Sequence, residues 1–406
     1  MAWYRHAADF ISESLSNPRT QTPLVAVAGA SFTLGLLLPS LFSHKEHGTR
    51  VLRSPRPVLS PEQNAGHPLP NDVLPGARDV ETPYGSIRVY EWGPEDGQKV
   101  LFVHGITTPC IALGGVAHAL VDRGCRVMLF DLFGRGYSDC PSDVPQDDRL
   151  FTTQIFLALN SSPISWTGAG SNKFSLVGYS LGGGIAASFA SFFPQLLTSL
   201  ILLAPSGLLR DSQISLQSRF LYSRGLIPEP VLKQLVARRL GAGPLVTPKL
   251  KKDEKLNAGN VLTEELPSQG AASVQVLSRK YPQVTVPGAV KWQVNNHTGF
   301  VHAFMSSMRS GPILQQREWD TWTRIGQRLT AQRDLSPEEQ RRNGLPSDKV
   351  FVLCGSDDSI ILREQVSPDA TKAFDGNVQF KYFDAGHEFP STRYDEVAQV
   401  ISDVLH

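Results

Sequence analysis

A serine lies at the centre of the segment Gly178-Tyr179-Ser180-Leu181-Gly182, between an apolar run, FSLVGY, and a helical pattern, LGGGIAASFASFF. A sharp turn from a strand into a helix exposes such a serine, and the two glycines leave room for the strand and the helix to pack. This context predicts that Ser180 is a nucleophile. A serine hydroxyl also needs a base to accept its proton and a carboxylate to orient that base.

Candidates for the base and the carboxylate follow two later apolar runs. The run VFVLC is followed by Gly355-Ser356-Asp357-Asp358, and the run VQFKYF is followed by Asp384-Ala385-Gly386-His387. In open α/β folds, ligands bind beyond the carboxyl ends of the parallel strands, so residues at these positions can meet Ser180. We therefore predict that His387 is the base, and that Asp357 or Asp358 orients it.

Stabilising the oxyanion of an acyl-transfer reaction takes backbone amides that point at the developing charge. One predicted donor is the N–H of Leu181, the residue after the nucleophile. The second should come from the loop after the run KVLFV, where the N–H of Ile106 is preferred and that of Thr107 is the second choice. His104 in this loop and Asp131 in a later glycine-rich turn are expected to be structural, because such turns need side-chain hydrogen bonds to their backbone.

Short apolar runs that alternate with helical patterns indicate an α/β fold, with a mostly parallel sheet and helices on both faces. The predicted strands are 86–92, 100–103, 127–130, 174–177, 200–203, 350–353 and 378–383. Between residues 204 and 350 no convincing strand occurs, which is far longer than an ordinary connection and predicts a largely helical insertion. The clearest predicted helices are 181–193, 230–240, 300–308 and 394–405.

These patterns suggest the following organisation of the 406-residue chain. We predict an N-terminal segment (1–22), a membrane anchor (23–42), a proline-rich linker (43–78), a core made of residues 79–209 and 311–406, and a helical cap (210–310).

The composition excludes several classes of protein. Hydrophobic residues make up 41% and charged residues 19% of the chain, which is typical of globular domains, and the net charge of +1 gives no reason to expect nucleic-acid binding. Residues 210–348 are locally basic, with 20 Lys and Arg against 12 Asp and Glu. The four cysteines lie far apart without metal-ligand spacing, so we predict neither a structural zinc nor a disulfide scaffold.

Residues 23–42 contain no charged side chain, and twenty residues in a helix just span a bilayer core. A retained single-pass anchor is the preferred interpretation; a targeting segment or a helix lying on the folded domain is the alternative. Two basic residues precede this segment and four follow it, which places the catalytic domain in the cytosol. Glycosylation triplets at Asn160 and Asn296 would fit a lumenal face and keep the orientation open.

Taken in their order along the chain, the segments that contain the candidate catalytic residues resemble those of the α/β-hydrolase superfamily. The resemblance rests on His104-Gly105, on Asp131 with Gly134-Arg135-Gly136-Tyr137-Ser138, on the Ser180 segment, and on Asp358 with Gly386-His387. It runs from about residue 79 to the C-terminus, excluding most of the insertion, which it identifies as a cap domain with residues 297–309 as its closing helix. In the related pattern the acid is the fourth residue of a Gly-x-x-Asp turn, and this selects Asp358.

The resemblance implies a serine hydrolase that needs no metal or organic cofactor. An apolar cap beside the predicted membrane anchor suggests that its substrate is a small lipophilic ester or acyl compound. A serine stands where epoxide hydrolases and haloalkane dehalogenases carry aspartate, which argues against both chemistries. A carbon–carbon bond hydrolase and a thioesterase or cyclase of a biosynthetic pathway are alternatives, because the same triad serves all three. A non-catalytic binding protein and a membrane-tethered scaffold are further alternatives. The substrate-binding residues and the oligomeric state are not predicted.

Overall fold

A computed structural model describes residues 50–56, 59–167, 173–214, 229–241, 266, 276–346 and 348–405. The chain divides into residues 1–49 and 50–406, and every described residue belongs to the second unit. The predicted anchor at 23–42 and the N-terminal segment therefore lie outside the described residues. Among those that are described, no helix combines the length and the apolar content needed to cross a membrane.

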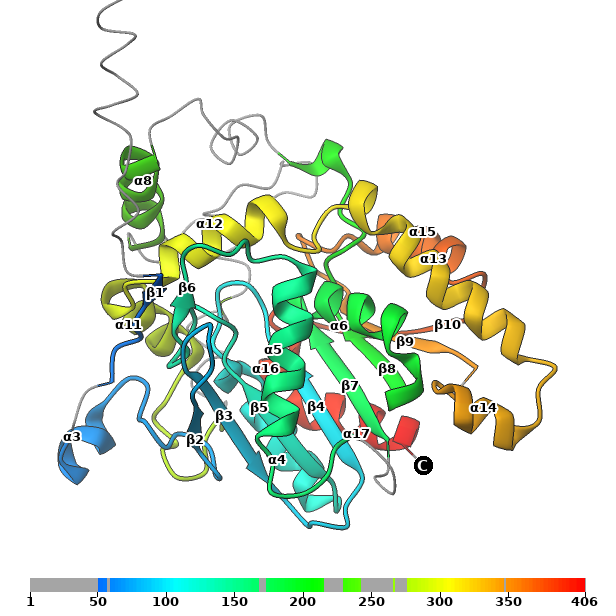
Figure 1. Ribbon diagram of the computed structural model, residues 1–406, viewed down its shortest axis with the longest axis horizontal. Coiled ribbons are helices and arrows are strands. Elements are labelled where there is room, and N and C mark those ends of the chain that lie inside the picture. Colours follow the sequence, from blue (N-terminus) through cyan, green and yellow to red (C-terminus); the bar gives the residue numbers. More distant parts are fainter. Residues whose placement is uncertain are drawn as a thin grey trace, which may run out of the picture. The chain divides into compact units, whose positions relative to one another are not determined.

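An eight-stranded sheet forms the centre of this unit (Figure 1), with the strand order β10-β9-β8-β7-β4-β5-β3-β2. All neighbouring strands from β10 to β5 are parallel, whereas β3 is antiparallel to both β5 and β2. The strands are β2 (Arg78–Val80), β3 (Ile87–Trp92), β4 (Lys99–Val103), β5 (Arg126–Phe130), β7 (Phe174–Tyr179), β8 (Leu197–Leu203), β9 (Val350–Gly355) and β10 (Val378–Phe383). The α/β prediction is confirmed.

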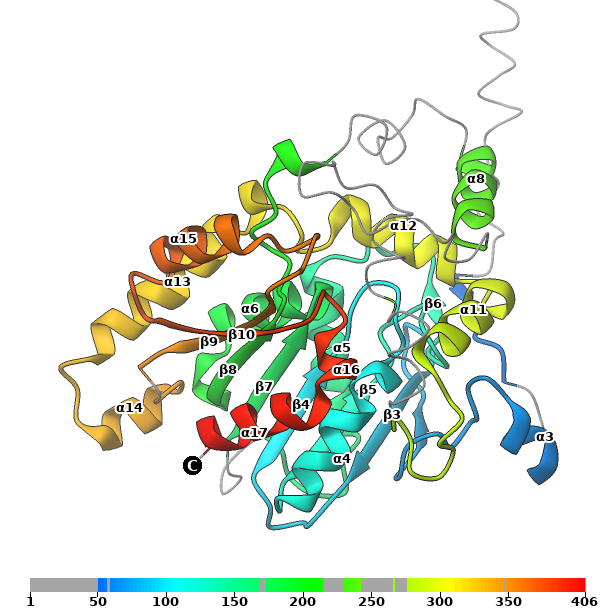
Figure 2. The ribbon, with the colours of Figure 1, turned by 180° about the vertical axis from the view of Figure 1, so that it is seen from behind.

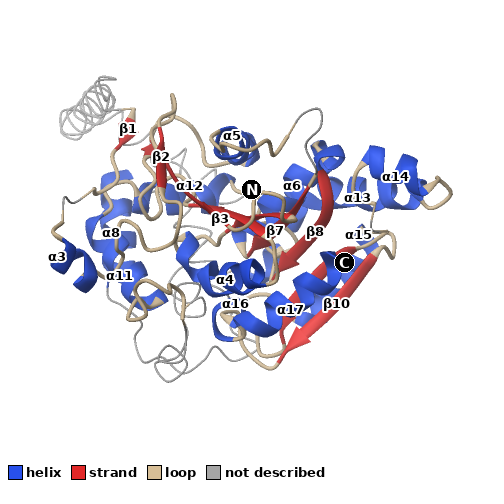
Figure 3. Ribbon diagram, turned by 90° about the horizontal axis from the view of Figure 1, so that it is seen from below, coloured by secondary structure: helices blue, strands red, loops and turns tan. Residues whose placement is uncertain are grey.

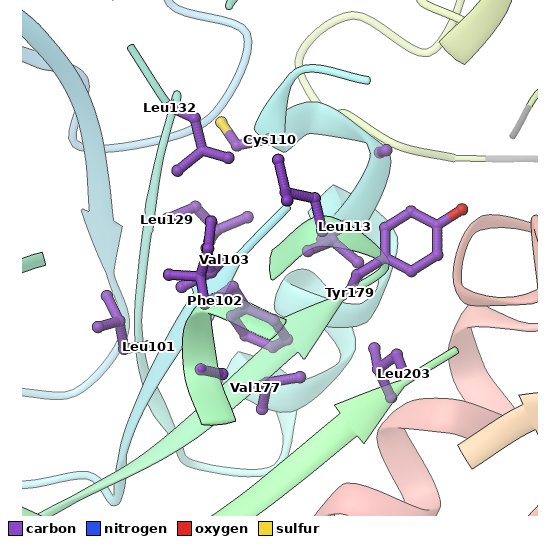
Figure 4. Close-up of a cluster of buried hydrophobic side chains, with 14 of the residues drawn as sticks. Leu101, Phe102, Val103, Cys110, Leu113, Leu129, Leu132, Val177, Tyr179 and Leu203 are labelled. Atoms are coloured by element: carbon purple, nitrogen blue, oxygen red, sulfur yellow. The ribbon is translucent and has the colours of Figure 1, made fainter. Parts of the chain in front are cut away.

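The central strands are apolar on both faces because helices cover the sheet on both sides. Phe102 and Val103 of β4, Leu129 of β5 and Val177 of β7 belong to one buried cluster (Figure 4). On one face α6 contacts both α5 and α13, and α4, α16 and α17 cover the other face (Figures 2 and 3). The helices of the core are α4 (Gly114–Asp122), α5 (Asp148–Asn160), α6 (Leu181–Phe192), α13 (Gln315–Gln332), α14 (Pro337–Asn343), α15 (Arg363–Ala373), α16 (Phe389–Thr392) and α17 (Tyr394–Leu405).

The described part of the insertion consists mostly of helices. It contains α8 (Glu229–Gly241), α11 (Val286–Asn296) and α12 (Phe300–Ser310). The Thr285 hydroxyl caps α11 by accepting from the Gly288 N–H at 3.2 Å, and α12 ends before Gly311. In Figure 1, α12 crosses beyond the carboxyl ends of the strands. The insertion thus places α12 over the sheet edge where the candidate site residues occur.

The linker prediction for residues 43–78 needs correction in its described part. Residues 50–78 form β1 (Val51–Leu52), which pairs with β6 (Cys140–Pro141), and the short helix α3 (Pro61–Gly66). Leu69, Val73 and Leu74 are buried in the core of the domain. The composition did not predict this packing, because three isolated apolar residues show no helical or strand periodicity. Their burial still stabilises the fold, since it removes apolar surface from water.

Two acidic side chains interact electrostatically: Glu318 on α13 is buried, and Asp148 at the start of α5 is half-buried. Burial, and next the neighbouring Asp148 carboxylate, raise the pKa of Glu318 to about 7, and burial raises that of Asp148 to about 6. Because the folded pKa of Glu318 exceeds its unfolded value, the native state binds more protons in the range between them. The contribution of Glu318 to the free energy of unfolding is therefore fully present below about pH 4, where the carboxyl is protonated, and it falls as the pH rises towards 7.

We expect Glu318→Gln to stabilise the protein at pH 8, on the order of 2 kcal/mol, and to have little effect at pH 4, because the variant has no buried charge to form. Thermal or urea unfolding across this pH range measures the difference. Glu338→Gln, on the exposed side of α14, is the control and should show no such trend. A stabilisation by Glu318→Gln that is equal at both pH values would contradict the expectation.

Candidate active site

Ser180 sits in a strained turn between β7 and α6. Its backbone angles are φ 53° and ψ −118°, a left-handed conformation that non-glycine residues rarely adopt and that recurs at functional turns. The Ser180 N–H donates to Leu203 O at 2.9 Å, and Ser180 O accepts from the Ser206 N–H at 2.9 Å. These bonds hold the turn at the carboxyl end of the sheet.

Steric crowding explains why glycines occur two residues before and two residues after Ser180. A Cβ on Gly178 would lie 2.2 Å from Gly182 O, and a Cβ on Gly182 would lie 2.1 Å from Val103 O. Both distances are far inside van der Waals contact. The sequence pattern therefore reflects the close approach of β7, the first turn of α6 and the end of β4.

His387 and Asp358 meet at the same sheet edge. His387 Nδ1 lies 2.7 Å from Asp358 Oδ2, and both side chains are fully buried. Asp358 Oδ1 accepts from the N–H groups of Ile360 and Ile361, each at 2.8 Å. With one oxygen fixed by two backbone donors, the carboxylate presents its other oxygen to the imidazole.

Asp357, the other acidic candidate, is exposed, and its backbone N–H donates to Ala385 O at 3.0 Å.

The register of the sheet explains why these residues converge. Tyr179 of β7 pairs with Leu203 of β8, and Phe383 of β10 pairs with Gly355 of β9. Ser180, Asp358 and His387 thus follow the ends of β7, β9 and β10. The Tyr179 hydroxyl donates to His387 O at 3.2 Å, and the two rings are 5.3 Å apart, so His387 lies beside the serine turn.

The predicted oxyanion donors lie on two neighbouring elements. Leu181 is the first residue of α6, where amide groups have no acceptor within the helix. Val103 at the end of β4 pairs with Gly178, which brings the turn containing Ile106 and Thr107 next to the serine turn. Ile106 is 4% exposed and Thr107 is fully buried.

His104 shows the structural role expected from the sequence. Its Nε2 accepts from the Leu132 N–H at 2.8 Å, and its Nδ1 donates to Gly105 O at 2.9 Å. Burial, and next the nearby Arg135 charge, lower its pKa to about 3, so the ring stays neutral. His104 therefore joins the loop after β4 to the loop after β5.

Asp131 also serves the backbone, as predicted. Its carboxylate accepts from the Cys110 N–H at 2.9 Å and from the Tyr137 N–H at 3.0 Å. A Cβ on Gly136, whose φ is 51°, would lie 2.1 Å from Asp131 Oδ2. Glycine is thus required for the turn to close around this carboxylate.

The sequence assigned no role to three buried polar side chains: Arg135, Gln293 and Ser307. The Arg135 guanidinium donates to Ile106 O at 3.1 Å and to Ser307 Oγ of α12 at 2.9 Å. Gln293 of α11 donates to Thr107 O and accepts from the Gly136 N–H at 3.0 Å. The glycine-rich setting of Arg135 was a usable signal, whereas Gln293 lies in the insertion without any motif around it.

Within the described ranges, no group of three or more His, Cys, Asp and Glu side chains could hold a metal ion. Cys110, Cys125, Cys140 and Cys354 are all buried and form no disulfide. Burial raises the pKa of Cys140 to about 12, so this thiol stays protonated. The absence of a cofactor remains a prediction from the sequence.

Comparisons with known proteins agree with this fold. Residues 100–400 match the model of the alpha/beta hydrolase family. An uncharacterised protein of Mycobacterium tuberculosis is 32% identical over 143 residues, which cover 35% of this chain and 39% of the relative. A serine hydrolase-like protein of Dictyostelium discoideum is 31% identical over 124 residues, covering 30% of this chain and 33% of the relative.

The matched region therefore spans less than two fifths of the length of these curated relatives. Among solved structures, one from Burkholderia cenocepacia assigned as an aryl esterase superposes with a TM-score of 0.51. It is 14% identical, and the match covers 81% of this chain and 97% of that one. At this identity the likeness concerns the fold alone.

Proposed function

Because the chain belongs to the α/β-hydrolase family, we propose that it is a serine hydrolase with Ser180, His387 and Asp358 as its catalytic triad. The observation that carries the proposal is the 2.7 Å contact between Asp358 and His387, beside a serine held at positive φ. A hydrogen-bonded carboxylate at Nδ1 leaves the other ring nitrogen to act as the base.

In the proposed mechanism, Ser180 Oγ attacks the substrate carbonyl while His387 accepts the hydroxyl proton. Asp358 stabilises the imidazolium that forms. The N–H groups of Leu181 and Ile106 donate to the oxyanion, and His387 returns the proton to the leaving group. A water molecule, activated by the same histidine, then hydrolyses the acyl-enzyme.

We further propose that the acyl group is lipophilic. In support, α12 carries a buried apolar face that includes Phe300, Phe304 and Met305. Its C-terminal end reaches the serine turn, since a Cβ on Gly311 would lie 3.4 Å from Leu181 Cδ1. An apolar helix next to the acyl position favours hydrocarbon groups over polar ones.

An active-site probe and a substrate panel test this function. We expect a fluorophosphonate to label the wild-type protein, with peptide mapping placing the adduct on Ser180. Among p-nitrophenyl esters of rising chain length, acyl thioesters and β-diketones, the esters with longer acyl chains should give the highest kcat/KM. Heat-denatured protein is the control for non-specific labelling.

Other outcomes would select the alternatives. Faster cleavage of the diketones would favour a carbon–carbon bond hydrolase, and faster cleavage of the thioesters would favour a thioesterase. Absence of both labelling and turnover, with retained binding of a long-chain ester, would favour a binding protein and overturn the catalytic proposal.

A further inference from the structure

Three successive carbonyls in the turn after β4 are each held by a buried side chain. Gly105 O accepts from His104 Nδ1 at 2.9 Å, Ile106 O accepts from Arg135 Nε at 3.1 Å, and Thr107 O accepts from Gln293 Nε2. Since the peptide bonds here are trans, each N–H points away from the carbonyl of its own peptide unit. Fixing these carbonyls therefore fixes the directions of the following N–H groups.

This geometry bears directly on the proposed oxyanion site. The Gly105 carbonyl shares a peptide plane with the N–H of Ile106, the preferred donor, and the Ile106 carbonyl shares one with the N–H of Thr107, the second choice. The Thr107 carbonyl, which Gln293 holds, belongs to the next peptide unit, which is joined directly to the unit of the Thr107 N–H and only through it to the unit of the Ile106 N–H. A donor hydrogen bond must point at the oxyanion within a narrow angle, so small rotations of these planes alter its strength.

Two of the three side chains connect the turn to the cap. Gln293 lies on α11 and also accepts from the Gly136 N–H at 3.0 Å. Arg135 donates to Ser307 Oγ on α12 at 2.9 Å. Gln293, Arg135 and Ser307 are all fully buried, where breaking a hydrogen bond leaves a polar group without water to replace the lost partner.

We propose that Gln293 is a positioning residue, through which cap helix α11 sets the orientation of the oxyanion turn. This inference rests on the proposed hydrolase function. Gln293 touches no reacting atom: its amide nitrogen fixes Thr107, and its amide oxygen fixes the glycine-rich turn that carries Arg135.

Gln154 on α5 offers a matched control. This fully buried glutamine also bridges two backbone groups: it accepts from the Phe133 N–H at 3.1 Å and donates to Asp131 O at 3.0 Å. Both hydrogen bonds lie within the loop after β5, which is joined to the turn after β4 through the bond between the Leu132 N–H and His104. Gln293→Met and Gln154→Met therefore remove the same chemistry from two buried sites, and only the first site includes the turn after β4.

We expect Gln293→Met to lower kcat for a p-nitrophenyl ester by about 10- to 100-fold with KM within about threefold, because the loss falls on transition-state stabilisation. Amide hydrogen exchange in a peptide covering residues 104–109 should quicken. Gln154→Met, at a similar loss of thermal stability, should keep kcat within about threefold and leave exchange in that peptide unchanged.

Gln293→Glu keeps the test decisive if the methionine variant does not fold. A protonated glutamic acid can still donate to Thr107 O, whereas a carboxylate cannot. We expect the ratio of its kcat to that of the wild type to fall as the pH rises. Thermal unfolding at each pH must show that the variant is still folded at the assay temperature, because a buried carboxylate also lowers stability as the pH rises.

The experiments distinguish a failure of the proposed role of Gln293 from a failure of the proposed hydrolase function. Equal effects of Gln293→Met and Gln154→Met on kcat, or a flat kcat ratio for Gln293→Glu together with unchanged exchange, would overturn the role of Gln293 while a fluorophosphonate still labels Ser180. No labelling of wild-type protein would overturn the hydrolase function, and the positioning role with it.

Discussion

Ser180→Ala and His387→Ala are each expected to lower ester turnover by about 10⁴- to 10⁶-fold, the largest effects that we predict for this protein. Removing Ser180 deletes the nucleophile, and removing His387 leaves the Ser180 hydroxyl without a base. Members of a triad act as a unit, so the double variant should be hardly slower than either single variant. Steady-state and single-turnover kinetics on the same ester measure these losses.

Folding and binding need separate controls in this experiment. Ser180→Ala keeps a Cβ at the strained φ of 53°, so its thermal unfolding should stay close to that of the wild type. KM for the ester should change far less than kcat in both variants. Residual turnover within tenfold of the wild type in Ser180→Ala would place the nucleophile elsewhere and remove the basis of the proposed mechanism.

The sequence revealed most of the sheet because the central strands are buried on both faces. All seven predicted strands are present. Continuous apolar runs such as FSLVGY are typical of strands in a parallel sheet that helices cover on both faces. The strand β2 escaped prediction because Arg78-Asp79-Val80 lies at the edge, where polar side chains reach water and no apolar run is needed.

Segments that isolated apolar contacts hold in place could not be predicted either. Leu69, Val73 and Leu74 anchor the region that composition alone marked as a linker. Within the candidate site, positions that follow strands were predictable, since strand ends converge at one sheet edge. Gln293 was not, because its role depends on how the cap packs against two distant turns, and no local pattern encodes that packing.

The choice between two adjacent acids gives the second large prediction. Asp358 Oδ2 lies 2.7 Å from His387 Nδ1, and Asp358 is 5% exposed, whereas Asp357 is exposed to solvent. Asp358→Asn should therefore lower kcat by about 10⁴-fold, because the amide nitrogen can donate to Nδ1 and so favours the imidazole tautomer that cannot act as the base. Asp357→Asn should stay within about twofold of the wild type.

The pair is a matched test, because both changes replace one carboxylate by an amide in the same turn. Asn at position 358 can still accept, through its amide oxygen, from the N–H groups of Ile360 and Ile361, so the turn has its backbone partners in either variant. A pH–rate profile adds a second readout: the remaining activity of Asp358→Asn should rise at alkaline pH, where hydroxide replaces the missing base. If Asp357→Asn proved the slower variant, the exposed carboxylate would have to orient the imidazole, and the geometry described for His387 would not be the one that catalyses.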